Sequence, residues 1–302
     1  MNNYSTELLL NLIGKKIIIA GSNGYIGTEL VNQLELNNID YIGIDKISSN
    51  KINCLNFNLS DNKKVIDVLS AEKPDYFFHL GTHSALAYKN DFLNVFHEDS
   101  SAIHNIISNL KKIDNTQLIY FSSSYVYSGL DVNNTVNETI ILNPSHNFGL
   151  SKSFFEQLIQ REYPNSIIFR LSSVFGQGNS LHPNAIEVMA KEAINNKLLT
   201  IWGNGNRKMQ YVFLADVVKY MLKAPELKPG IYNLGGHSYD TVMATANQIA
   251  KYFGAKTKIL SDKKEGETLP PMDNNKVIDA LGEDYFSDHQ KSLIKYLANI
   301  AN

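Results

Sequence analysis

The stretch IIIAGSNGYIGTEL, residues 17–30, decides the fold of this chain. A short apolar run leads into Gly21, Gly24 and Gly27, and an amphipathic stretch of helix length follows. Glycines in this order permit a tight turn and a close backbone approach, so the N-terminus of the helix can face a pyrophosphate. A glycine triplet alone is a weak signal. Its position between the first strand and the first helix is the context that a dinucleotide-binding loop requires.

The second apolar run ends in Asp45, near the spacing at which an acid binds the adenosine ribose in such folds. Its carboxylate would accept hydrogen bonds from both ribose hydroxyls and would repel a 2′-phosphate, which favours NAD over NADP. Lys46 is a counter-signal, because a cation there could tolerate that phosphate. The predicted NAD contacts are Gly21, Asn23, Gly24, Tyr25, Ile26, Gly27, Asp45, Lys46, Asn58, Leu59, Leu80 and Gly81.

Apolar runs of strand length alternate along the chain with amphipathic stretches of helix length. The runs lie at 15–21, 40–45, 54–59, 75–81, 117–124 and 166–173. Short apolar runs without internal alternation are typical of strands buried on both faces of a parallel sheet. The sequence therefore predicts an α/β fold, a doubly wound parallel (Rossmann) sheet with a smaller C-terminal substrate-binding subdomain. The predicted NAD-binding domain comprises 1–172 and 210–236, and the predicted subdomain comprises 173–209 and 237–302.

Composition and charge argue against several classes of protein. The net charge is −2 and the pI is about 6.4, with lysines spread thinly, so nothing favours binding to nucleic acid or to an anionic membrane. No apolar segment is as long as the about 20 residues that a helix needs to span a bilayer. Cys54 is the only cysteine, which excludes a disulfide framework and a cysteine-based metal site. We expect a cytoplasmic protein without a metal.

Eight segments, in this order and spacing, carry a resemblance to a known family. They are GSNGYIG at 21–27, FHLGTHS at 78–84, YFSSSYVYSG at 120–129, FGLSK at 148–152, RLSSVFGQG at 170–178, IWGNG at 201–205, VFLADVV at 212–218 and YNLGG at 232–236. Over nearly its whole length the chain resembles the extended short-chain dehydrogenase/reductases that act on nucleotide sugars, the NAD-dependent epimerase/dehydratases. The resemblance implies a nucleoside diphosphate sugar as substrate.

The resemblance also assigns catalytic positions. In the family, a Ser or Thr after the fifth strand and a Tyr-x-x-x-Lys pair on the next helix surround the nicotinamide. These positions fall on Ser123, Phe148 and Lys152, and the lysine is expected to bind the nicotinamide ribose as well. In the family the lysine lowers the pKa of the tyrosine, which then takes a proton from a sugar hydroxyl. Phe148 keeps the shape of that tyrosine but holds no proton.

Three explanations of Phe148 stay open. It is an introduced replacement of a tyrosine, which would trap substrate. Alternatively, another group supplies the proton, and the candidates are His83, Tyr125 and His146. The third explanation is a non-catalytic relative that binds NAD and a sugar nucleotide.

The segment at 120–129 bears on the type of reaction. The 4,6-dehydratases of the family carry an Asp-Glu pair after the hydroxyl residue, where this chain has Ser124 and Tyr125, so elimination is disfavoured. The segment resembles both the deoxysugar 4-ketoreductases and UDP-galactose 4-epimerase. The expected reaction is hydride transfer at a sugar carbon of a nucleoside diphosphate hexose, and both reaction types stay open.

Residues around the expected substrate depart from the family pattern. Met209 stands where many members have an arginine for the diphosphate, and Asp99 falls near a usual asparagine. The predicted substrate contacts are His83, Ser124, Tyr125, Ser173, Arg207, Met209 and Lys264. In the family, the helices corresponding to about 91–112 and 148–163 form a four-helix dimer interface, so the resemblance implies a homodimer.

Overall fold

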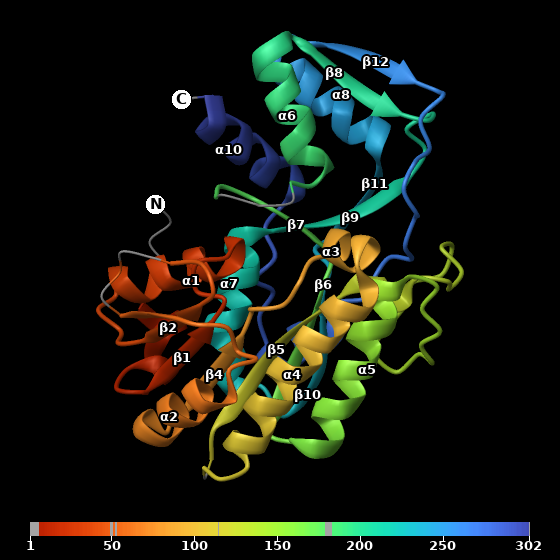
Figure 1. Cartoon of the computed structure of the whole chain (residues 1–302). Helices are drawn as coiled ribbons and strands as arrows, with labels where there is room; N and C mark the ends of the chain where they lie inside the picture. The colour runs from red at the N-terminus through yellow and green to blue at the C-terminus, as the bar shows by residue number, and fades with distance from the viewer. Residues whose placement is uncertain (1–5, 49–50, 52, 114, 179–182, 302) are drawn as a thin grey trace.

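The computed structural model describes residues 6–48, 51, 53–113, 115–178 and 183–301. Its centre is a seven-stranded parallel sheet with the strand order β3-β2-β1-β4-β5-β6-β10 (Figure 1). The strands are β1 Ile17–Ala20, β2 Ile42–Asp45, β3 Cys54–Asn56, β4 Tyr76–His79, β5 Gln117–Ser123, β6 Ser166–Leu171 and β10 Gly230–Leu234. The predicted doubly wound parallel sheet is confirmed.

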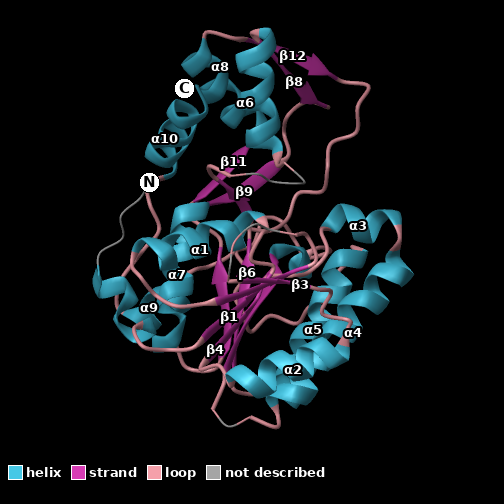
Figure 2. Cartoon of the chain, turned by 60° about the vertical axis from the view of Figure 1, so that its left-hand side comes forward, coloured by secondary structure: helices cyan, strands magenta, loops and turns pink. Residues whose placement is uncertain are grey.

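Helices cover both faces of this sheet, as Figure 2 shows. One side carries η1 Thr6–Leu12, α1 Tyr25–Leu36, α7 Leu214–Lys223 and α9 Asn275–Leu281. The other side carries α2 Asn62–Glu72, α4 Phe92–Leu110 and α5 Asn147–Glu162. In β1, Ile17 and Ile19 pack into the first side and Ile18 and Ala20 into the second. Both faces of the strand are buried, which explains its uninterrupted apolar run.

A smaller group of elements lies above the sheet in Figure 1. It comprises β7 Ser173–Phe175, α6 Ala185–Asn196, β8 Leu198–Trp202, β9 Lys208–Phe213, β11 Ser238–Thr241, α8 Val242–Phe253, β12 Lys256–Leu260 and α10 His289–Ala301. Strands β11, β9 and β7 form one sheet, β12 and β8 form another, and the group has its own apolar core. Helix α9, although late in the chain, packs against β10 of the main sheet. Three short helices complete the described chain: α3 Ala85–Asn90, η2 Ser124–Tyr127 and η3 Ala224–Glu226.

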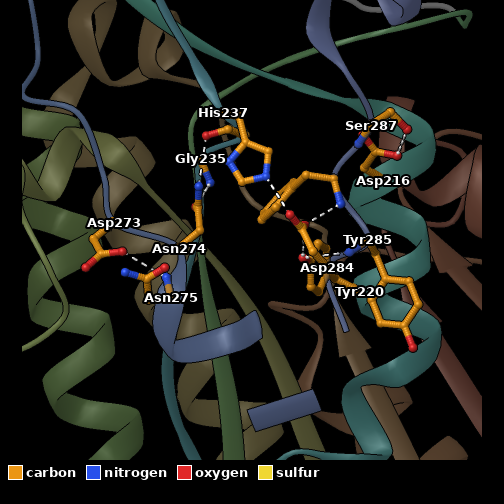
Figure 3. Close-up of polar contacts among 12 residues, drawn as sticks. Asp216, Tyr220, Gly235, His237, Asp273, Asn274, Asn275, Asp284, Tyr285 and Ser287 are labelled. Carbon is orange, nitrogen blue, oxygen red and sulfur yellow. Dashed lines mark hydrogen bonds and ion pairs between the residues drawn. The ribbon is translucent and has the colours of Figure 1, made fainter. Parts of the chain in front are cut away.

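Polar contacts hold the residues on both sides of α9 against the segment that follows β10 (Figure 3). The Asn274 side chain accepts a hydrogen bond from the Gly235 N–H (2.7 Å) and donates one to the Gly236 carbonyl (2.8 Å). His237 and Asp284 form an ion pair at 2.7 Å if the imidazole is protonated. These contacts fix the path of the chain from β10 to α10. The two-domain division stays a prediction, and its residues 1–5, 49–50, 52, 114, 179–182 and 302 lie outside the described residues.

No helix in the described ranges is long and apolar enough to cross a membrane. Within those ranges there is also no group of three or more His, Cys, Asp or Glu side chains that could hold a metal ion.

Candidate active site

Two glycines of the loop after β1 have no room for a side chain. Gly21 has φ +83°, and a Cβ there would lie 2.6 Å from the Gly81 nitrogen. A Cβ on Gly27 would overlap the Gly21 carbonyl oxygen, so both glycines are required by the space available. Gly24 is the N-cap of α1, and no described side chain caps this helix. The free N–H groups at its N-terminus therefore suit an anion such as a pyrophosphate.

Asp45 ties the glycine loop to the loop after β2. One of its carboxylate oxygens accepts a hydrogen bond from the Asn23 backbone N–H and the other accepts one from the Ile47 N–H, both at 2.9 Å. The residue lies at the end of its strand and is only 8% exposed. An acid held in this way has a fixed orientation.

A cavity of about 160 Å³ lies beside this acid. Its lining includes most of the predicted cofactor residues, namely Gly21, Gly24, Asp45, Lys46, Asn58, Leu59, Leu80 and Gly81. Asn23, Tyr25, Ile26, Gly27 and Lys152 do not line it. Tyr25 points elsewhere, since its hydroxyl donates to the Gly176 carbonyl at 2.9 Å. A tightly packed glycine loop next to a fixed acid fits a dinucleotide with an unphosphorylated adenosine ribose.

His83 lines this cavity, whereas most of the other predicted substrate residues line a second pocket, described below. Its Nδ1 lies 2.8 Å from an Asp99 carboxylate oxygen, and its backbone N–H donates to the other at 3.3 Å. Its Nε2 lies 3.1 Å from the Lys46 ammonium and 3.3 Å from Glu98. Burial raises the pKa of Asp99, but the hydrogen bond from His83 and the charge of Lys152 lower it more. The imidazole is thus fixed on the cofactor side.

Lys152 is buried on α5 and reaches the carboxyl ends of the strands. Its ammonium donates to Thr82 Oγ1 (3.0 Å), the Tyr120 hydroxyl (3.2 Å) and the Phe121 carbonyl (2.9 Å). It also lies 5.6 Å from the centre of the Phe148 ring. Thr82 belongs to the cofactor cavity, so Lys152 contacts the wall of that cavity from outside.

Burial lowers the pKa of Lys152 to about 8, although the negative charges of Asp99 and Glu156 oppose the shift. A depressed pKa of this kind is typical of lysines at functional sites.

A second pocket, of about 320 Å³, lies where β5 meets the elements above the sheet. It brings together the predicted residues Ser123, Ser124, Tyr125, Ser173, Arg207 and Met209. Sequence reasoning missed the remaining lining residues, which are Ser172, Pro183, Asn184, Ala185, Lys208, Gln210, Leu269 and Pro270. They come from segments far apart in the chain, and no local pattern marks them.

The prediction for Lys264 is not matched by its position, because the residue is exposed and does not line this pocket. Its neighbour Glu265 has a structural contact instead. The Glu265 carboxylate accepts hydrogen bonds from the backbone N–H groups of Asn204 (2.7 Å) and Arg207 (2.6 Å). The segment at 263–267 thus holds the turn before β9 in place.

Residues 17–235 match the model of the NAD dependent epimerase/dehydratase family. This chain belongs to that family. The family's dependence on NAD agrees with the glycine loop and with Asp45, so the predicted cofactor is confirmed.

Two curated relatives of this family member carry different activities in their names. A dTDP-D-glucose 4,6-dehydratase of Dictyostelium discoideum is 29% identical over 262 residues, which are 74% of this chain and 59% of the relative. A putative UDP-glucose 4-epimerase of Methanocaldococcus jannaschii is 26% identical over 282 residues, covering 88% of this chain and 92% of the relative. The chain thus spans less than two thirds of the first relative's length and nearly all of the second's.

Solved structures share the epimerase fold. UDP-glucose 4-epimerase of Thermotoga maritima with UDP-glucose has a TM-score of 0.83 and 21% identity, covering 95% of this chain and all of that one. UDP-glucose 4-epimerase of Thermus thermophilus with NAD has a TM-score of 0.83 and 17% identity, covering 94% and 98%. At these identities the likeness shows the fold.

Phe148, which is expected at the position of the family tyrosine, is buried among aromatic side chains. Its ring centre lies 5.5 Å from that of Tyr88 and 5.8 Å from that of Tyr125, which it meets edge-on. His146 is the N-cap of α5, and its Nδ1 accepts a hydrogen bond from the Phe148 N–H at 3.1 Å. The rings of Tyr125 and His146 are 4.7 Å apart. Both residues that could replace the tyrosine on this side therefore lie beside Phe148.

Proposed function

We propose that this chain is an NAD-dependent nucleotide-sugar oxidoreductase that transfers hydride at a sugar carbon of a nucleoside diphosphate hexose, as a 4-epimerase or a 4-ketoreductase. The proposal rests on the position of α5 between the cofactor cavity and the second pocket. Lys152 contacts Thr82 in the wall of the cofactor cavity, and Phe148 contacts Tyr125 in the wall of the second pocket. A substrate in the second pocket would therefore lie next to the cofactor, at the carboxyl ends of the strands.

Different residues of the chain would bind different parts of the cofactor and the substrate. The loop at Gly21 and Gly24 would hold the pyrophosphate, and Asp45 would hold the adenosine ribose. Bound NAD would supply the oxidant, because it accepts a hydride with its electron pair. Ser123 would bind the reacting sugar oxygen, and the cation of Arg207 would bind the diphosphate at the far side of the pocket. Met209, next in the wall, offers only apolar contact.

Similar proteins support the substrate class. The relatives carry dTDP-glucose and UDP-glucose in their names, and the T. maritima epimerase was solved with UDP-glucose. A further neighbour of the same fold was solved with UDP-glucuronic acid and NAD, at a TM-score of 0.83 and 18% identity. Elimination is less well supported, because Ser124 and Tyr125 stand where the dehydratases carry carboxylates.

The second candidate is a protein that binds NAD and a sugar nucleotide without converting it. Two residues favour it. Phe148 lacks the family's proton acceptor, and Met209 lacks the family's positive charge.

A homodimer and a cytoplasmic location are also part of the proposal. The outer faces of α4 and α5 expose Leu93 (75%), Leu150 (50%) and Phe154 (48%). Exposed apolar side chains gathered on two neighbouring helices favour burial against a second copy of this chain.

The proposed substrate class is tested by thermal shift with a panel of UDP-, dTDP-, GDP- and CDP-hexoses in the presence of NAD. The expected result is a further rise in Tm with at least one of them, because a bound ligand stabilises the folded state. No rise with any of them, while NAD itself stabilises the chain, would contradict a nucleotide-sugar substrate.

A further inference from the structure

We propose that the hydroxyl of Tyr125 carries the proton that the sugar exchanges with the protein, in place of the family tyrosine at position 148. The inference rests on the proposed function. It assigns a proton acceptor to a site that lacks the family's acceptor because residue 148 is phenylalanine.

Three tyrosines near Lys152, near Phe148 or in the neighbouring helix η2 have engaged hydroxyls. Tyr88 donates to Asp99 at 2.7 Å, and Tyr120 is completely buried and bonded to Lys152. The Tyr127 hydroxyl, which is also completely buried, is bonded to Arg170 and Asn233 at 2.7 and 2.8 Å.

Burial is the main cause of a raised pKa in each of these three, and it brings the pKa of Tyr127 to about 12. Each stays a neutral phenol at ordinary pH. None of the three lines the second pocket.

Tyr125 differs from them in its position and in its contacts. It is half-buried, it lines the second pocket with Ser123, and its hydroxyl has no hydrogen-bond partner among the described residues. The Ser123 hydroxyl accepts the Tyr125 backbone N–H at 3.3 Å, so the two residues of the pocket wall are fixed relative to one another.

A glycine brings Tyr125 against Phe148. Helix η2 and the first turn of α5 approach so closely that a Cβ at Gly149 would overlap the Tyr125 carbonyl oxygen. With only hydrogen at position 149, the Tyr125 ring can meet the edge of Phe148 at 5.8 Å. The phenol is thereby held beside the position of the family tyrosine.

The two histidines are less suited to the role. His83 is committed to Asp99, Lys46 and Glu98 on the cofactor side. His146 uses Nδ1 to accept the Phe148 N–H, so in the neutral ring the proton is on Nε2. Burial lowers its pKa, which favours that neutral form. His146 is then a positioning residue that packs on the Tyr125 ring at 4.7 Å.

The proton step conserves atoms and electrons. The phenol of Tyr125 first releases its own proton to water in the second pocket. The O–H bond of the sugar hydroxyl then breaks as an O–H bond forms at the Tyr125 oxygen. In the same step the sugar carbon loses its hydride, with the electron pair, to bound NAD, and the C–OH group becomes C=O. In the reverse direction the Tyr125 hydroxyl returns the proton to that oxygen as hydride comes back to the carbon.

The test uses the full chain with NAD and a hexose nucleotide that it converts. Tyr125→Phe should lower kcat by ~10²- to 10⁴-fold, as loss of a general base does, and should leave the Kd of NAD and of the sugar within about threefold. Tyr252→Phe, on the exposed face of α8, is the matched control and should change neither kcat nor the two Kd values. Adding Phe148→Tyr to Tyr125→Phe should restore at least about tenfold of the lost turnover, since it returns a phenol to the neighbouring position.

Each other outcome overturns the assignment. A Tyr125→Phe chain that keeps its turnover, or that loses affinity for the sugar in parallel, gives Tyr125 a packing role. If Phe148→Tyr restores no turnover in the double variant, Tyr125 likewise has only a packing role. A gain of ~10²- to 10⁴-fold from Phe148→Tyr alone would show that position 148 is the working one. A chain that binds NAD and the sugars but converts none contradicts the proposed function itself, which distinguishes the two failures.

Discussion

At the scale of single residues, Asp45 holds the glycine loop, and we propose that it also determines the choice of cofactor. Asp45→Ala frees the N–H groups of Asn23 and Ile47 and removes the acceptor for the ribose hydroxyls. We expect NAD binding to weaken by about 1 to 3 kcal/mol, measured by calorimetry. Asp40→Ala, at an exposed acid just before β2, is the matched control and should have no effect. NADP binding more tightly than NAD to the unchanged chain would refute this role of Asp45.

His79, at the end of β4, should make stability depend on pH. It is buried, neither ring nitrogen has a partner among the described residues, and burial lowers its pKa from 6.5 to about 4. The folded pKa lies below the unfolded value, so the stabilisation is complete above about pH 6.5 and is lost as the pH falls through about 4. Between about pH 7 and about pH 4.5 the loss should be roughly 2 kcal/mol.

Urea unfolding of the original chain and of His79→Phe checks this dependence. The variant should lose roughly 2 kcal/mol less over the same range, because its ring cannot take up a proton in the unfolded state. Equal pH dependence in the two chains would mean that His79 is protonated in the folded protein.

At the scale of elements, the contact between η2 and α5 shapes the pocket wall. Gly149→Ala places a methyl group on the Tyr125 carbonyl, and the two helices must separate. We expect a loss of about 1 to 3 kcal/mol in unfolding free energy together with a fall in turnover. Asn147→Ala, on the exposed side of the same turn, is the control and should stay close to the original chain. Unchanged stability in Gly149→Ala would show that η2 can shift freely.

Elements whose signals are local were predictable. The apolar runs of β1, β4, β5 and β6 indicate burial on both faces of the sheet, and Gly21 and Gly27 indicate a backbone approach that leaves no room for side chains. The prediction for the run at 54–59 was wrong in this respect, because β3 lies at the edge of the sheet and its residues are exposed or half-buried. Positions set by long-range contacts were not. His83 was expected at the substrate, but Asp99 draws it to the cofactor side.

The second pocket shows the same division. The family resemblance predicts Tyr125 and Arg207. Asn184, the N-cap of α6, and Gln210 in β9 also line the pocket, but no local sequence pattern predicts them. In the segment at 263–267, the positive charge of Lys264 is the reason for its prediction as a substrate contact. The contacts with the turn before β9 are instead made by Glu265.

At the scale of the whole molecule, the exposed apolar side chains of α4 and α5 predict self-association. Light scattering should give twice the mass of one chain, and Leu93→Glu combined with Leu150→Glu should give a single chain, because burying the introduced carboxylates is unfavourable. Ile141→Glu is the control, since Ile141 is 87% exposed but lies outside both helices. A monomer in the original chain, or an unaffected dimer in the double variant, would place the interface elsewhere.

The central claim is that this chain moves hydride at a sugar carbon. The most direct measurement is NMR of each nucleoside diphosphate hexose incubated in D₂O with the chain and NAD, and of the corresponding 4-keto sugars with NADH. The account predicts a C4 epimer, or the reduced sugar, with no deuterium at C4, because the hydrogen that moves never exchanges with water. Binding of the sugars without any conversion, or deuterium incorporated at C4, would contradict it.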